Sequence, residues 1–170
     1  MTPEREAYVK KLLEIDKDRY SQTLNIKINE FEPGKLEAET RVTEDHINTI
    51  GSAHGGFLFS FCDKAGGYCA GSTGMGGPTI TANISYLQPA LLGDTLICKA
   101  DVIHAGETTA AVDVTVYNKD TGTVNCRAMF HYARKFPVSM DSADNLGKTF
   151  DAYSKGSHAR AAARKGKADA

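Results

Sequence analysis

The stretch NTIGSAHGGFLFSFCDKAGG, residues 48–67, decides how this chain folds. It begins as a loop of small and polar residues and continues from Gly55 as an apolar segment. Five residues of that segment recur at the spacing of one helix face: Leu58, Phe61, Cys62, Ala65 and Cys69. One acid, Asp63, stands inside this apolar run. The stretch therefore predicts a helix that is buried over a broad face and carries a carboxylate for a reason other than packing.

Two strands and a further helix are expected before this segment. NIKINEFE (residues 25–32) and KLEAETRV (residues 35–42) each alternate apolar and polar positions on either side of a Pro-Gly turn, which predicts a hairpin. Residues 3–19 have helical spacing, with Thr2 as an N-cap candidate and Pro3 at the first helical position.

The segment after the apolar helix predicts an antiparallel meander. Four alternating runs are separated by short turns that contain Gly or Asp: residues 79–87, 95–104, 108–118 and 124–134. A sheet with one dry face and a helix with a broad apolar face bury each other when the sheet curls around the helix. The fold class is therefore α+β, with a curved antiparallel sheet wrapped around a long central helix.

The composition excludes several classes of function. The chain has 170 residues and a net charge of −1, which predicts one domain of ordinary size and does not favour a nucleic-acid partner. No apolar run reaches the roughly 18 residues that span a bilayer, and the charged N-terminal segment lacks the apolar region of a secretory signal, so no membrane partner is expected. The four cysteines have no C-x-x-C spacing, which favours free buried thiols, a cytoplasmic location and no metal site.

Three motifs carry a resemblance to a known family. They are N-x5-HGG-x6-D (residues 48–63), TANISYLQPALLGDTL (residues 81–96) and HAGETTAAVDVTVYN (residues 104–118). In this order they resemble the hotdog-fold acyl-CoA thioesterases of the PaaI type, over residues 24–134. The resemblance implies one hotdog domain over residues 1–136, hydrolysis of acyl-CoA to a free acid and CoA, and no cofactor, since CoA is part of the substrate. It also implies a homodimer, and commonly a homotetramer, with active sites at the dimer interface.

The same resemblance assigns roles to individual residues. The Gly55 N–H faces the thioester oxygen, and Asp63 acts as a general base on water or as a nucleophile that forms a mixed anhydride. Asn48 and His54 orient the thioester and the attacking water. Thr79 stands where relatives carry a hydroxyl residue that helps to position the water.

The spacing between two of these residues indicates a shared site. Asp63 lies eight residues beyond Gly55, about 12 Å along a helix, which is too far to act on a carbonyl held at its own helix start. It can reach a carbonyl at the start of an antiparallel helix in a second copy. Each side chain also has a plainer alternative. His54 caps a loop, Asn48 stabilises a turn, Thr79 is an ordinary strand residue, and Asp63 lies on a solvated face beside Lys64.

The CoA phosphates require basic side chains or backbone N–H groups. Gly56, Gly106, Arg134 and Lys135 are the candidates, although Glu107 stands where relatives often carry a basic residue. The plainer alternative for Arg134 and Lys135 is that they are ordinary charged residues at the end of a strand. The nature of the acyl group stays open, because it depends on how five aromatic residues pack: Phe57, Phe59, Phe61, Tyr68 and Tyr86.

Two other functions stay open, a non-catalytic acyl-CoA-binding or regulatory module and a hotdog acyl-CoA hydratase. The C-terminal segment, residues 137–170, lies outside the resemblance. It has few large apolar residues and is basic near its end, so we expect a polar tail that is disordered or loosely helical.

Overall fold

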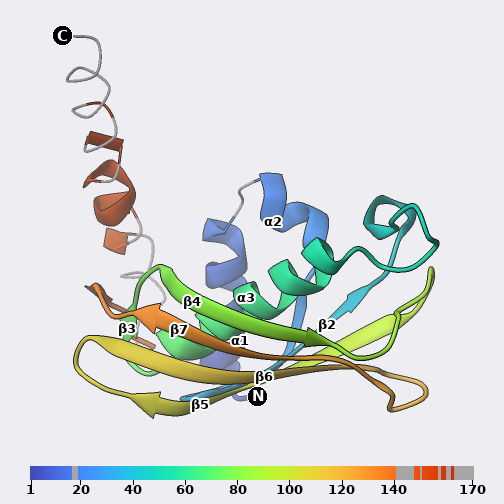
Figure 1. Ribbon diagram of the computed structural model, residues 1–170. Coiled ribbons are helices and arrows are strands. Elements are labelled where there is room, and N and C mark those ends of the chain that lie inside the picture. The colour runs from blue at the N-terminus through green and yellow to red at the C-terminus, as the bar shows by residue number, and fades with distance from the viewer. Residues whose placement is uncertain (17–18, 141–147, 150, 157, 160–161, 163–170) are drawn as a thin grey trace, which may run out of the picture.

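A six-stranded antiparallel sheet curves around one central helix in the computed structural model of the chain (Figure 1). The structure describes residues 1–16, 19–140, 148–149, 151–156, 158–159 and 162. The central helix α3 (Gly55–Gly71) lies on the concave face of the sheet. The α+β architecture predicted from the hydrophobic patterns is therefore confirmed.

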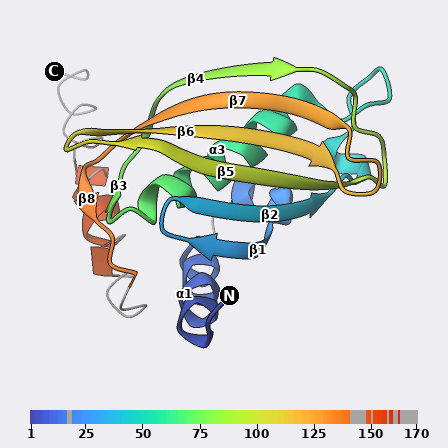
Figure 2. The ribbon, with the colours of Figure 1, turned by 90° about the horizontal axis from the view of Figure 1, so that it is seen from below.

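The strands follow a meander with one departure, in the order β1-β2-β5-β6-β7-β4 (Figure 2). Their bounds are β1 Lys27–Glu32, β2 Lys35–Arg41, β4 Thr79–Tyr86, β5 Thr95–Ala105, β6 Thr109–Asn118 and β7 Val124–Ala133. The strand β4 thus forms one edge of the sheet, and β1 forms the other. All six strands were predicted, because their sequences alternate between apolar and polar residues.

The helix α3 forms where the apolar spacing predicts it. Its N-cap is His54, and the five residues of the predicted face are almost completely buried against the sheet: Leu58, Phe61, Cys62, Ala65 and Cys69. Burying a side chain as large as Phe61 contributes about 1.5–3 kcal/mol to stability. This helix therefore holds the centre of the core, and both of its ends are fixed in position.

The N-terminal helix is shorter than predicted. The helix α1 (Pro3–Ile15) begins with the expected cap, in which the Thr2 hydroxyl accepts from the Arg5 N–H at 3.4 Å. It ends at Ile15 instead of continuing to residue 19, and the carboxylate of its C-cap residue, Asp16, contacts Lys64 and Tyr68 on α3. The short helix α2 (Arg19–Leu24), which was not predicted, follows, since six residues are too few to show a helical period. The helix α1 lies beside β1 (Figure 2).

A small second sheet was also missed. The strands β3 (Met75–Gly76) and β8 (Phe136–Pro137) pair with each other, and neither was predicted as a strand. A Cβ at Gly77 would stand 2.0 Å from the Ala133 carbonyl oxygen, so the close approach of these backbones requires glycine. Strands of two residues carry no alternation, and the sequence therefore could not reveal them.

The folded part of the chain extends past the expected boundary at residue 136. Pro137 lies in β8, and Val138 is buried in the core. Further along, described residues of the predicted tail are helical, and the Tyr153 ring contacts Phe136 with centroids 4.6 Å apart. Residues 141–147 and 163–170 lie outside the described part of the chain, so the expectation for them stays a prediction.

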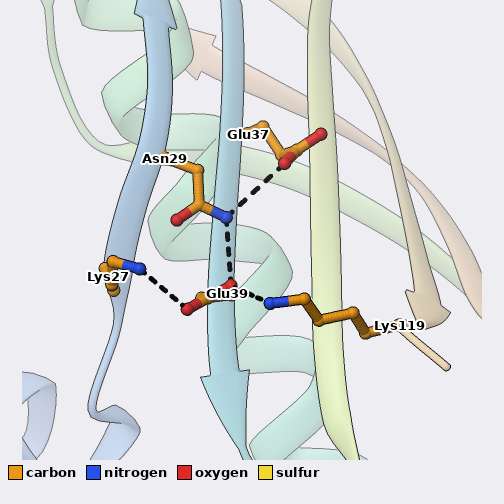
Figure 3. Close-up of polar contacts among 5 residues, drawn as sticks. All are labelled: Lys27, Asn29, Glu37, Glu39 and Lys119. Carbon is orange, nitrogen blue, oxygen red and sulfur yellow. Dashed lines mark hydrogen bonds and ion pairs between the residues drawn. The ribbon is translucent and has the colours of Figure 1, made fainter.

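The convex face of the sheet carries a polar network across β1 and β2 (Figure 3). The Glu39 carboxylate accepts from Lys119 and Lys27, each at 3.0 Å, and from Asn29 at 3.2 Å. These donors, Lys119 foremost, lower the pKa of Glu39 to about 2. The network links β1, β2 and the turn after β6, so it has a structural role.

Four free thiols lie inside the fold, as predicted, and the sulfur atoms of Cys62 and Cys126 are 3.7 Å apart. Burial raises the pKa of the Cys69 thiol to about 12, which keeps it protonated and unreactive. None of the helices in the described residues combines the length and the apolarity needed to span a bilayer.

Candidate active site

The N-terminal end of α3 presents a backbone N–H group. The His54 Nδ1 atom accepts from the Gly56 N–H at 2.8 Å, so the Gly56 amide is occupied and the His54 ring carries its own proton on Nε2. The Gly55 N–H, by contrast, has no acceptor among the described residues. An unpaired N–H at a helix N-terminus attracts negative charge. Gly55 therefore carries a free N–H at the start of α3, and its role toward a thioester stays a prediction. The capping alternative describes the contact that His54 makes.

The Asn48 side chain organises the loop before the helix. Its Oδ1 atom accepts from the N–H groups of Ile50 and Ser52, at 3.0 and 3.2 Å, and its Nδ2 atom donates to the Ser52 hydroxyl at 3.1 Å. Asn48 therefore makes the contacts expected of the alternative in which it stabilises a turn. The bonds fix the backbone just ahead of Gly55, and they leave Asn48 in the wall of a cavity.

That cavity, of about 320 Å³, lies at the N-terminal end of α3. Its walls come from the loop, from α3 and from the end of β4: Asn48, Ser52, Ala53, Gly55, Leu58, Tyr86, Leu87, Gln88 and Pro89. The Tyr86 hydroxyl donates to the Gly55 carbonyl oxygen at 2.9 Å. The end of β4 is thereby attached to the start of α3.

Asp63 lies in a different cavity, of about 230 Å³. It is half-buried, and its Oδ1 atom accepts from the Thr79 hydroxyl at 2.6 Å. Lys64, its neighbour, is paired with Asp16 instead. Asp63 therefore does not form the solvated ion pair of the plainer alternative, and Thr79, at the start of β4, is more than a strand residue.

A third contact to Asp63 was not found from the sequence. Tyr132 on β7 is buried, and its hydroxyl donates to the Asp63 carbonyl oxygen at 2.9 Å and lies 3.4 Å from Oδ1. Burial, together with the charge of Asp63, raises the pKa of Tyr132 far above its usual range, so the phenol stays a donor. Tyr132 occupies an ordinary inward position of an alternating strand 69 residues away, which gives no sequence signal.

Gly66 makes room for this tyrosine. A Cβ at Gly66 would lie 2.5 Å from the Tyr132 hydroxyl oxygen, whereas a Cβ at Gly67 would lie 3.6 Å from the nearest atom of that ring. Gly66 and Gly67 both lie inside α3, where glycine is less favourable than alanine and needs a reason. The structure supplies the reason for the first.

We expect the Gly66→Ala variant to be less stable than the wild type, although alanine is the better helix former by about 1 kcal/mol. The overlap with Tyr132 adds an overpacking cost of about 1–3 kcal/mol, which exceeds this gain. Urea unfolding measures the difference, and Gly67→Ala controls for helix propensity. In the Tyr132→Phe background, which lacks the hydroxyl oxygen, Gly66→Ala should cost little stability, because the next ring atom stands 3.3 Å from the new Cβ. Equal stability of Gly66→Ala and Gly67→Ala would contradict this account.

Three of the four residues predicted to bind CoA phosphates are already engaged, and the first of them is Gly56, whose N–H donates to His54. The Gly106 N–H donates to the Thr109 carbonyl oxygen at 2.9 Å and closes the β5–β6 turn, so the expectation of a free amide there is wrong. The Arg134 guanidinium donates to the Thr73 hydroxyl at 2.5 Å and to the Thr73 carbonyl oxygen at 3.2 Å. It thus binds the turn that follows α3. The side chain of Lys135, next along the chain, is exposed.

The aromatic residues singled out from the sequence divide between core and cavities. Phe61 is fully buried in the core, and Phe57 stacks on His46 with centroids 3.8 Å apart. Of the five aromatic residues named from the sequence, only Tyr68 lines the Asp63 cavity, and only Tyr86 lines the cavity at the start of α3. Among the described residues, no cluster of three His, Cys, Asp or Glu side chains is placed to hold a metal ion.

Comparison with known proteins identifies the family. A family model described as "Thioesterase superfamily" matches residues 50–125. Acyl-coenzyme A thioesterase 13 from Homo sapiens is 37% identical over 92 residues, which are 53% of this chain and 66% of that protein, just under two thirds of its length. Acyl-coenzyme A thioesterase PaaI from Escherichia coli is 33% identical over 109 residues, 64% of this chain and 78% of that protein.

Solved structures share the fold over about two thirds to three quarters of this chain. A hypothetical thioesterase protein from Streptococcus pneumoniae, in a crystal structure with coenzyme A, matches with a TM-score of 0.70 and 32% identity, over 75% of this chain and 99% of that one. Two mutants of a hypothetical thioesterase protein from the same organism, one with an aspartate and one with a threonine replaced by alanine, match at 34% and 33% identity with TM-scores of 0.62 and 0.63. They cover 64% and 65% of this chain, and 90% of each mutant chain is covered.

The two mutated positions are 16 residues apart, as are Asp63 and Thr79 here. The fold, the HGG-x6-D motif at the start of α3 and the extent of these matches agree, and this chain belongs to the thioesterase superfamily, as a hotdog-fold protein of the PaaI type.

Proposed function

We propose that this protein hydrolyses the thioester bond of an acyl-CoA, in a site that two copies of the chain build together. One observation carries the proposal: the strand β4 holds one half of the site at each of its ends. Thr79, at its start, bonds to Asp63, and Tyr86, at its end, bonds to Gly55. The names of the relatives and the coenzyme A bound to the pneumococcal protein support the substrate class.

The two halves are too far apart to act together within one chain. Asp63 lies eight residues after Gly55 on the same helix, a rise of about 12 Å. The strand β4 is an edge strand whose residues are mostly exposed, including Ile80 and Tyr86, each more than half exposed. An edge of eight residues with exposed apolar side chains invites pairing with another strand.

Antiparallel pairing of β4 with the β4 of a second copy joins the two halves. Centred on the middle of the strand, this pairing sets Thr79 of one copy opposite Tyr86 of the other, at a strand separation of about 4.8 Å. The Asp63 carboxylate then stands near the Gly55 N–H of the second copy. The two-fold axis creates two identical sites, and a homodimer is the smallest active unit.

The chemistry follows from what each half offers. The free Gly55 N–H holds the thioester oxygen and stabilises the oxyanion that forms when the carbonyl carbon is attacked. In the general-base route the Asp63 carboxylate takes a proton from water while the water oxygen bonds to that carbon. The C–S bond then breaks, and the CoA sulfur leaves as thiolate and is protonated. Thr79 donates to one carboxylate oxygen and so orients the other toward the water.

Mixed dimers test both the activity and the sharing of the site. We expect release of free CoA thiol from acyl-CoAs by the wild type, and very little from either Asp63→Asn or Gly55→Pro. Co-expression of the two variants with different tags allows the mixed dimer to be purified. One of its two sites then combines an intact Asp63 with an intact Gly55, so it should show about half of the wild-type activity per dimer.

The experiment distinguishes failure of the shared site from failure of the hydrolase function. A mixed dimer no more active than its parents would overturn the shared site while leaving hydrolysis in place. A wild type that releases no thiol from any acyl-CoA would overturn the hydrolase function and favour an acyl-CoA-binding module.

A further inference from the structure

The Asp63 cavity has a wall that the family motifs do not include. Part of its lining comes from the N-terminal helix α1, through Tyr8 and Leu12. Residues of the sheet and of β8 complete the apolar lining, among them Phe31 and Phe136. The helix α1 lies outside residues 50–125, which the family model matches.

Three tyrosines line the cavity, and two of their hydroxyls are paired. The Tyr132 hydroxyl donates to Asp63, and the Tyr68 hydroxyl donates to Asp16. The third, on Tyr8, makes no hydrogen bond with any described residue, although the side chain is only 2% exposed. Its ring is held by stacking on Phe31, with centroids 5.7 Å apart.

The unpaired hydroxyl opens to the cavity. In the described part of the chain, two side-chain atoms have neither solvent exposure nor a hydrogen-bond partner, namely Asn125 Oδ1 and Arg134 Nε. The Tyr8 oxygen is not among them, so it keeps some exposed surface. Burial raises the pKa of Tyr8 to about 12, which leaves a neutral phenol able to donate or accept. A buried hydroxyl without a partner is costly, and a ligand atom that pairs with it removes that cost.

We propose that Tyr8 is a specificity-determining residue whose hydroxyl hydrogen-bonds an oxygen at the far end of a compact acyl group. The inference rests on the proposed function, because it places the acyl group beside Asp63. The cavity volume of about 230 Å³ limits the size of that group. An apolar cavity of about 150 Å³ holds benzene, so this one holds a group of about one ring with a short linker.

Matched thioesters test the role of Tyr8. The probes are two pairs that differ only by a terminal hydroxyl: phenylacetyl-CoA with 4-hydroxyphenylacetyl-CoA, and hexanoyl-CoA with 6-hydroxyhexanoyl-CoA. We expect the wild type to prefer the hydroxylated member of at least one pair by about tenfold in kcat/KM, the effect of one hydrogen bond in a desolvated cavity. In Tyr8→Phe that ratio should fall to about one, while the unsubstituted member keeps its rate.

Tyr117→Phe is the matched control, since Tyr117 lies on β6 beside Lys99 and away from both cavities. It should keep the wild-type ratio. A structural role for Tyr8 would lower the rates of both members equally and leave the ratio unchanged, which would overturn the proposal. A wild type without any preference in either pair would overturn it too, even if the variant did not fold. Absence of hydrolysis of all four probes and of every other acyl-CoA would instead defeat the proposed function itself.

Discussion

Replacing Asp63 by Asn is expected to slow thioester hydrolysis by about 10²–10⁴-fold, the range by which a positioned acid or base accelerates a reaction. The amide oxygen of the new side chain still accepts from the Thr79 hydroxyl, so the local structure is retained while the group that takes the proton is lost. Free-thiol release from a panel of acyl-CoAs measures the effect. Size-exclusion chromatography checks that assembly is unchanged.

Asp113→Asn provides the matched control for this substitution. Asp113 lies on β6, on the convex side of the sheet, and pairs with Arg127 at 2.9 Å. The same chemical change there should leave hydrolysis within about twofold of the wild type, because exposed ion pairs contribute little. Equal activity of wild type and Asp63→Asn would remove Asp63 from the mechanism.

Labelling with ¹⁸O from water distinguishes the two possible roles of Asp63, general base and nucleophile. In a single turnover in H₂¹⁸O, a general-base mechanism places the label in the released acid. A mixed-anhydride mechanism, with water attacking the Asp63 acyl carbon, places it in the Asp63 carboxylate. Mass spectrometry of the peptide that contains Asp63 distinguishes the two results.

Replacing Gly55 by Pro is expected to lower kcat by about 10²–10³-fold, the usual effect of removing one oxyanion donor. Proline removes the N–H and adds a side-chain ring at this position. Gly55 is the first residue of α3, where proline is readily accommodated, and His54 has φ −62° and ψ 134°, which is the conformation that a residue before proline adopts. Stopped assays of thiol release at saturating substrate measure kcat.

Gly55→Ala is the control that isolates the N–H group. Both variants add a Cβ, which would lie 3.3 Å from the Tyr86 ring, but alanine retains the N–H. We expect Gly55→Ala to keep most of the activity that Gly55→Pro loses. Similar losses in the two variants would mean that contact with Tyr86, and not the N–H, decides the effect.

Local patterns determined most of the fold. The period of the apolar residues predicted α3 and its start at Gly55, and alternation predicted all six strands of the main sheet. These signals succeed because a long element must present one continuous face to the core. The pieces that were missed, α2 and the β3–β8 pair, are too short to have a period.

The residues of the candidate site were predicted from the sequence, but the contacts between them were not. Asp63, Gly55 and Thr79 stand out in the sequence because an acid in an apolar helix, a glycine at a helix start and a motif spacing are local features. Their grouping is not local, since Thr79 meets Asp63 only where β4 returns beside α3.

Only the tertiary structure decided which neighbours these residues have. It showed that Tyr132 holds Asp63 and requires glycine at position 66, and that Tyr8 closes the cavity from α1. It also showed that the Gly106 amide is already paired. A sequence pattern specifies which face of an element is buried, whereas contacts between distant segments depend on how those faces pack in three dimensions.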